Sequence, residues 1–195
     1  MDPHYRCANE NRRRRVIDSP LNGVDVLEVL DSGAQALGLP RQQVLRVLFL
    51  KDLPADGAPD ALDASNVAIE AEPRAAAVHV VWARRASDID TDLVGNPDTD
   101  APLTLAQRDA LRTADGADQT LVVMTDGTGD FSTYTLRLVT SLTDDGPPDG
   151  VDQRLAVVAF SFKVECPSDF DCAPEDACPP EIFDEPAIDY LAKDY

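Results

Sequence analysis

Several residue types are scarce in this 195-residue chain, which has three lysines, two histidines, one tryptophan and four cysteines. It also lacks any run of about 18 apolar residues, so we expect no membrane-spanning helix and no membrane partner. The first 20 residues are polar and include four consecutive arginines where a secretory leader would carry an apolar core. We therefore expect no signal peptide.

The scarcity of histidine argues against the common catalytic arrangements. His4 and His79 lie far apart, and no serine stands at a suggestive spacing from either of them; we considered Ser19, Ser132 and Ser161. Nucleophilic catalysis by a Ser–His pair therefore has no support in the sequence. His79 alternates with Val78 and Val80, which predicts that its side chain points outward from a strand. We expect no enzyme and assign no catalytic residue.

Acidic residues are abundant, with 36 Asp and Glu against 17 Lys and Arg, for a formal net charge of -19. Such a surface resembles that of proteins from salt-accumulating halophiles, in which salt screens the self-repulsion. We interpret the charge as a mark of habitat. It also argues against nucleic-acid binding, which needs a basic footprint. The exception is the run Arg12 to Arg15, which either docks on an acidic neighbour or forms a solvated helix face.

Two acidic motifs are candidate ligand sites. Asp88, Asp90 and Asp92 have the spacing of half a calcium loop, but Leu93 stands where such a loop needs glycine. Residues 126–130 contain two glycines, but they lack the lysine and the following helix of a phosphate-binding loop. We interpret the first motif as chance in an acidic chain and the second as a tight hairpin turn.

The hydrophobic pattern predicts a mainly β protein. Turn-rich loops, including residues 32–42 and 54–63, separate short alternating or apolar segments. Short helices are expected from Arg12 to Val16 and from Leu103 to Leu111, with Thr104 as the cap. The expected fold is an antiparallel β-sandwich with an immunoglobulin- or fibronectin-like outline. The seven expected strands are residues 24–30, 44–50, 66–71, 76–83, 120–124, 131–139 and 155–164.

Two local features of this sandwich are predicted in more detail. Residues 66–71 and 76–83 are expected to pair as a hairpin around residues 72–74. In the segment 131–139, one of the two alternating faces is the better candidate for the core. That face carries Tyr134, Leu136 and Leu138.

The cysteines are unevenly distributed. Cys166, Cys172 and Cys178 are separated by five residues each, and Cys7 lies near the other end of the chain. Without an export signal, a metal site or free thiols are favoured over a disulfide framework. The spacing is wider than the Cys-x2-Cys pairs of most zinc sites, and Pro179 after Cys178 is also found in ferredoxin motifs. The expected cofactor is a 4Fe–4S cluster, with structural zinc, disulfides or plain thiols as alternatives, and His4 as a substitute ligand.

A four-cysteine centre would pin the two ends of the chain to one point. It would constrain the unfolded chain most because the closed loop is long. The expected organisation is an N-terminal basic arm (1–20), a β-sandwich domain (21–165) and a Cys/Pro-rich metal-staple tail (166–195). An alternative is a small iron–sulfur electron-transfer protein. A carbohydrate-binding sandwich rests on fold analogy alone.

Extended blocks at both ends resemble one known family. They are Tyr5 to Cys7 with the arginines that follow, Leu21 to Val29, Gly129 to Val139, Phe160 to Cys172 and Ile188 to Tyr195. All of them are similar to baseplate assembly proteins of contractile injection systems, and the match is with J-like wedge proteins of phage-tail-like extracellular particles. Residues 54–118 contribute little to this resemblance.

The resemblance implies a structural wedge component and no enzyme activity. Such wedges link the hub and spike to the sheath and inner tube within a large six-fold assembly. The implied partners are a second wedge protein, a sheath adaptor and the hub or spike. Assembly would take place in the cytoplasm, with release as an extracellular particle. Members of the family continue well past the position of Tyr195, so we expect either the N-terminal piece of a longer polypeptide or a split wedge protein.

Overall fold

The computed structural model describes residues 4–6, 10–94 and 102–162. The chain divides into two units, Met1–Val164 and Glu165–Tyr195, and the description below concerns the first unit. Among the helices of the described ranges, none is long and apolar enough to cross a membrane.

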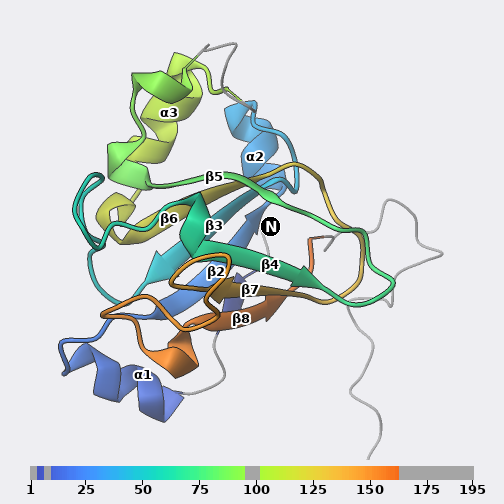
Figure 1. Cartoon of the computed structure of the whole chain (residues 1–195). Helices are drawn as coiled ribbons and strands as arrows, with labels where there is room; N and C mark the ends of the chain where they lie inside the picture. The colour runs from blue at the N-terminus through green and yellow to red at the C-terminus, as the bar shows by residue number, and fades with distance from the viewer. Residues whose placement is uncertain (1–3, 7–9, 95–101, 163–195) are drawn as a thin grey trace, which may run out of the picture. The chain divides into compact units, whose positions relative to one another are not determined.

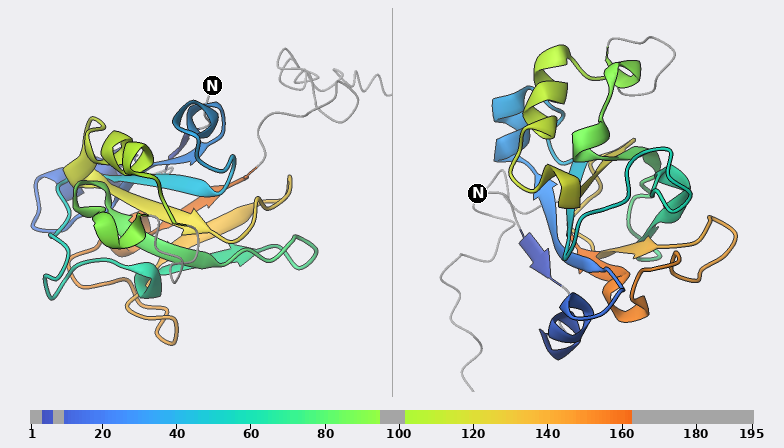
Figure 2. Two further views of the ribbon diagram at one scale, coloured as in Figure 1. Left: turned by 90° about the horizontal axis from the view of Figure 1, so that it is seen from above. Right: turned by 90° about the vertical axis from the view of Figure 1, so that its left-hand side faces the viewer.

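Two antiparallel sheets form the body of the described unit (Figure 1). The larger sheet has the strand order β1-β2-β3-β6-β5, and the smaller has the order β4-β7-β8. Figure 2 shows the same sheets from two further directions. The expected mainly β, sandwich-like fold is confirmed. The strands are β1 (His4–Arg6), β2 (Val24–Leu30), β3 (Val44–Phe49), β4 (Val67–Ala71), β5 (Val80–Arg85), β6 (Thr120–Thr125), β7 (Tyr134–Leu138) and β8 (Val157–Phe160).

Short helices connect and cover the strands. The α-helices are α1 (Glu10–Ile17), α2 (Ser32–Leu37) and α3 (Leu105–Arg112). Five 3-10 turns accompany them: η1 (Ala64–Asn66), η2 (Ala86–Asp88), η3 (Thr91–Leu93), η4 (Ala117–Gln119) and η5 (Gln153–Leu155). In Figure 1, α2 and α3 lie near one end of the larger sheet, and α1 lies near the opposite end.

The main core lies between the two sheets. Leu45 and Leu121 of the larger sheet belong to the same buried cluster as Leu136 and Phe160 of the smaller one. In β7 the alternation is complete, because Tyr134, Leu136 and Leu138 are buried while the residues between them are half-buried. The predicted core face of this segment is confirmed. Burial of such side chains contributes about 1.5–3 kcal/mol each.

A second core covers the opposite face of the larger sheet. Val44, Val122 and Met124 point into it, together with Trp82 of β5 and Leu111 of α3. Strand β6 is therefore buried along its whole length, and β3 is buried or half-buried throughout. A strand that is covered on both faces reads as a continuous apolar run instead of an alternating one. This explains the dense apolar segments of the sequence.

Helices α2 and α3 lie near the second core, and the sequence predicted only α3 correctly. For α3 the prediction is confirmed, since Thr104 Oγ1 accepts the Gln107 N–H and Gln107 Oε1 accepts the Thr104 N–H in a capping box. For residues 32–42 the loop prediction is wrong in part, because residues 32–37 form α2. Gly38 ends this helix with a left-handed φ of 67°, so the glycine that suggested a loop is a helix terminator.

Both predicted hairpins are wrong. Strand β4 pairs with β7 and strand β5 pairs with β6, so residues 72–79 pass from one sheet to the other. Likewise β6 and β7 belong to different sheets, so residues 126–130 are a crossover and not a hairpin turn. Sequential strands usually pair, and the prediction rested on that tendency. In a sandwich, a strand can instead be followed by a strand of the other sheet, so sequential strands need not pair.

Candidate functional site

The N-terminal arm is fastened into the sandwich by its first strand. Tyr5 lies opposite Leu27 in the β1–β2 pairing. The Tyr5 hydroxyl donates to the Ser161 carbonyl at 3.1 Å, and its ring meets Phe160 edge-on with centroids 6.2 Å apart. Burial raises the pKa of Tyr5. The start of the chain and the end of β8 therefore meet at one point.

Arg12 and Arg13 of the arginine run hold helix α1 to the same body. Arg13 donates to both carboxylate oxygens of Asp25, at 2.5 and 2.7 Å. Arg12 donates through Nε to Asp152 Oδ2 at 2.9 Å and through Nη2 to the same oxygen. Val16 anchors the helix with 1% of its side chain exposed. Arg12 and Arg13 thus form ion pairs within the chain, a use that neither sequence interpretation anticipated.

Asp152 is a buried carboxylate at the start of η5. Its Oδ1 accepts the Arg154 N–H at 3.1 Å, while Arg12 binds Oδ2. The hydrogen bond from Arg12 holds the pKa of Asp152 below its ordinary value, against the effect of burial. Both oxygens of this carboxylate are therefore bonded within the chain.

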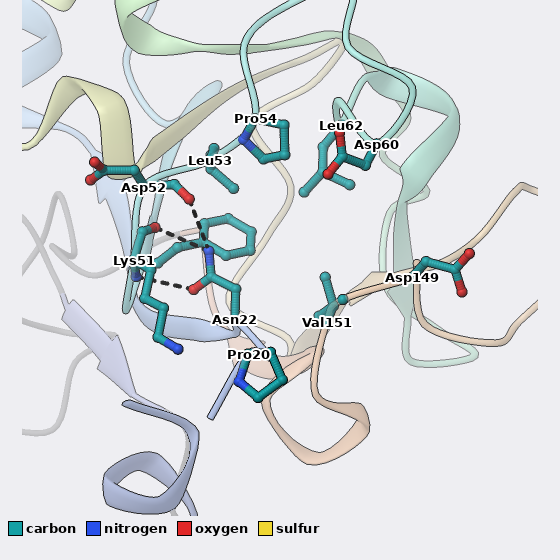
Figure 3. Close-up of a pocket in the computed structure, with 12 residues that line it drawn as sticks. Pro20, Asn22, Lys51, Asp52, Leu53, Pro54, Asp60, Leu62, Asp149 and Val151 are labelled. Atoms are coloured by element: carbon teal, nitrogen blue, oxygen red, sulfur yellow. Dashed lines mark hydrogen bonds between the residues drawn. The ribbon is translucent and has the colours of Figure 1, made fainter. Parts of the chain in front are cut away.

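A pocket of about 200 Å³ opens next to the segment that precedes Asp152 (Figure 3). It is built from three segments that are distant in sequence: residues 20–22, residues 49–62 and residues 149–151. Its apolar wall comes from the buried Phe49 and Leu53 and the half-buried Leu62 and Val151. Asp60 and Asp149 stand on the rim.

Asn22 joins the segments that surround the pocket. Its Oδ1 accepts the N–H of Gly23 at 2.9 Å. The same oxygen accepts the N–H of Lys51 at 3.0 Å, and Nδ2 donates to the Lys51 carbonyl at 3.0 Å (Figure 3). Its backbone donates to Gly150 O and accepts from Asp152 N, both at 2.8 Å. These polar groups already bond to each other, so the arrangement is suited to holding loops and offers no aligned nucleophile and base.

The Asp130 carboxylate is a third cross-link between segments. It accepts N–H groups from Ser132 at 2.8 Å and from Ala76 at 3.1 Å. The Tyr134 hydroxyl lies 3.2 Å from it and donates to Ala76 O at 3.0 Å. These hydrogen bonds lower the pKa of Asp130 to about 2. The residues 126–130, expected as a turn, thus tie the crossover 72–79 to β7.

Not all the candidate ligands of the sequence lie within the described residues. Cys7, Cys166, Cys172 and Cys178 lie outside them, and of His4 only the backbone is described. His79 is exposed, as predicted, although it lies just before β5 and not within a strand, and its Nδ1 lies 2.9 Å from Asp126 Oδ2.

One carboxylate of the calcium-like motif is engaged in an ion pair. Asp88 binds Arg85 through contacts of 2.6 and 2.9 Å, and this hydrogen bonding lowers the pKa of Asp88. Asp90 and Asp92 are exposed. Within the described ranges, no group of three or more His, Cys, Asp or Glu side chains is placed to hold a metal ion.

Comparison with known protein families identifies the family of this chain. A family model described as "Phage baseplate assembly protein, N-terminal domain" matches residues 1–160. The chain belongs to this family. The match takes in the arm, both sheets and the pocket of Figure 3, and it ends at the last residue of β8. Neither the curated proteins nor the solved structures contain a match. The resemblance to baseplate proteins is confirmed.

Proposed function

We propose that this baseplate domain is a structural wedge component of a contractile injection system, linking the hub and spike to the sheath and tube. The family match over residues 1–160 carries the proposal. The way in which polar side chains are used supports it. Asn22, Asp130 and Asp152 all tie chain segments together. A component that transmits force between neighbours needs such cross-links, and no enzyme activity is proposed.

The experiment is deletion of the gene in a strain that produces the particles, followed by electron microscopy. We expect sheaths and tubes without an assembled baseplate, restored by the gene in trans. Cryo-electron microscopy of intact particles should place the domain between the hub and the sheath, next to a second wedge protein and a sheath adaptor, in six-fold arrangement. Complete baseplates in the deletion strain would refute the proposal. Particles are expected to assemble in the cytoplasm before release.

We also propose that Cys7, Cys166, Cys172 and Cys178 form one metal centre that joins the two ends of this domain. The contact between Tyr5 and Ser161 supports it. Cys7 follows Tyr5 by two residues and Cys166 follows Ser161 by five. Five extended residues span at most about 18 Å, so these two cysteines are within reach of a common centre.

The wide cysteine spacing favours a 4Fe–4S cluster, and structural zinc is the alternative. The centre would close a long loop and thereby stabilise the fold. Iron, zinc and acid-labile sulfide should be measured on anaerobically purified protein, beside Cys7→Ser. Iron with sulfide supports the cluster, and zinc alone supports the alternative. Protein without metal whose stability is indifferent to Cys7→Ser would refute the centre and leave the wedge proposal intact.

A further inference from the structure

A cationic depression lies where helix α1 meets η5. It has a volume of about 410 Å³, and its lining residues are Asn11, Arg12, Arg15, Asp152, Gln153 and Arg154. Arg12 and Arg15 are three positions apart on α1, so they share one face of that helix. Arg154 comes from an element about 140 residues later in the chain. Folding thus places three arginines and one carboxylate in the lining of the same depression.

That carboxylate does not neutralise the depression. Asp152 is bonded through Oδ2 to Arg12 and through Oδ1 to the Arg154 backbone. Arg15 and the Arg154 side chain are exposed, and neither bonds to any group in the described part of the chain. Two guanidinium groups therefore present their donors to solvent. Arg15 lies on α1, which the Arg13–Asp25 pair and buried Val16 hold in place, and Arg154 lies on η5, which buried Leu155 anchors.

The composition makes this placement informative. The chain carries 36 acidic and only 17 basic residues. Carboxylates on the rim of a pocket are therefore expected by chance, whereas a cluster of arginines is not. The guanidinium group binds carboxylates in a bidentate manner, and such bonds withstand salt better when neighbouring atoms exclude water.

We propose that Arg15 and Arg154 bind an acidic segment of a neighbouring baseplate subunit. The proposal rests on the proposed function and names the chemistry of one of its contacts. Charge complementarity selects this occupant. A nucleic acid is disfavoured because it would bring a dense line of phosphates against a chain of net charge -19, whereas a peptide need supply only two carboxylates.

The test compares assembled particles that carry Arg15→Glu/Arg154→Glu, the neutral pair Arg15→Gln/Arg154→Gln, or Arg74→Glu. Arg74 is exposed and lacks any partner in the described residues, so it is the matched control. We expect the double Glu variant to be incorporated about tenfold less than wild type, and the Gln pair to fall between them. Arg74→Glu should stay within about twofold. Unchanged circular dichroism spectra would show that all variants fold.

A photo-crosslinking residue in place of exposed Gln153 identifies the occupant, with Glu72 as the control position. A cross-link to an Asp- or Glu-rich peptide of another subunit supports the proposal. Cross-links only to nucleic acid or to an uncharged surface would overturn it, as would normal incorporation of the double Glu variant. If wild-type protein is itself absent from the particles, the wedge assignment fails instead.

Discussion

A Cβ atom on Gly23 would lie 2.5 Å from the Cβ of Leu155, which is itself buried. Real Cβ atoms do not approach so closely, so Gly23→Ala must push η5 away from β2. We expect a loss of about 1–3 kcal/mol in the free energy of unfolding, measured by urea denaturation. Gly127→Ala is the control, because its Cβ would meet nothing closer than Val78 Cγ2 at 3.9 Å. Equal stability of the two variants would contradict this account.

Asn22→Ala should destabilise the domain by about 2–4 kcal/mol, because it leaves backbone groups of Gly23 and Lys51 without their partner. Amide hydrogen exchange gives the sharper readout, since the Lys51 N–H should lose protection first. Asn11→Ala is the control: Asn11 is exposed and makes no bond in the described ranges. If Asn22→Ala unfolds at the same urea concentration as Asn11→Ala, the Asn22 side chain does not hold residues 22–23 and 51 together.

The elements that could be predicted from sequence are those whose signal is local. The core face of β7 follows from alternation, and α3 follows from Thr104 and Gln107 three residues apart. Helix α2 could not be predicted because Gly33 is one of its six residues and Gly38 follows it, and its burial against the sheet depends on tertiary contacts. Single-residue propensities are too weak to decide such a short helix.

The sheet assignment and the junctions at the candidate site could not be predicted from local signals. Whether β4 pairs with β5 or β7 depends on which sheet each strand joins, and both choices satisfy alternation. Asp25 and Asp152 are two among 36 acidic residues, so nothing in the sequence marks them as partners of Arg13 and Arg12. The only local signal at Asn22 is the Asn-Gly pair, which is typical of a turn. Its role becomes visible when residues 51 and 150–152 lie beside it.

Acid should weaken the domain partly through Asp130. Its pKa is about 2 in the folded chain against an ordinary value of 3.8. A lowered folded-state pKa gives stability that is complete above about pH 4 and is lost as the pH falls toward 2. NMR titration should find this carboxyl at a pKa near 2. Asp130→Asn should flatten the decline of thermal stability between pH 4 and 2, whereas Asp149→Asn, at an exposed position without a partner in the described part, should leave it unchanged.

The arginines of α1 should separate into structural and surface residues. Arg12→Ala removes the partner of buried Asp152, so we expect a lower urea midpoint; Arg15→Ala should leave the midpoint at the wild-type value because Arg15 bonds to nothing in the described ranges. The pH dependence adds a second readout. Arg12 lowers the folded-state pKa of Asp152, so the pair contributes stability above the carboxyl's ordinary pKa and loses it as the pH falls. The difference between wild type and Arg12→Ala should therefore shrink in acid. A constant difference from pH 7 down to pH 2 would mean that Arg12 acts through packing alone.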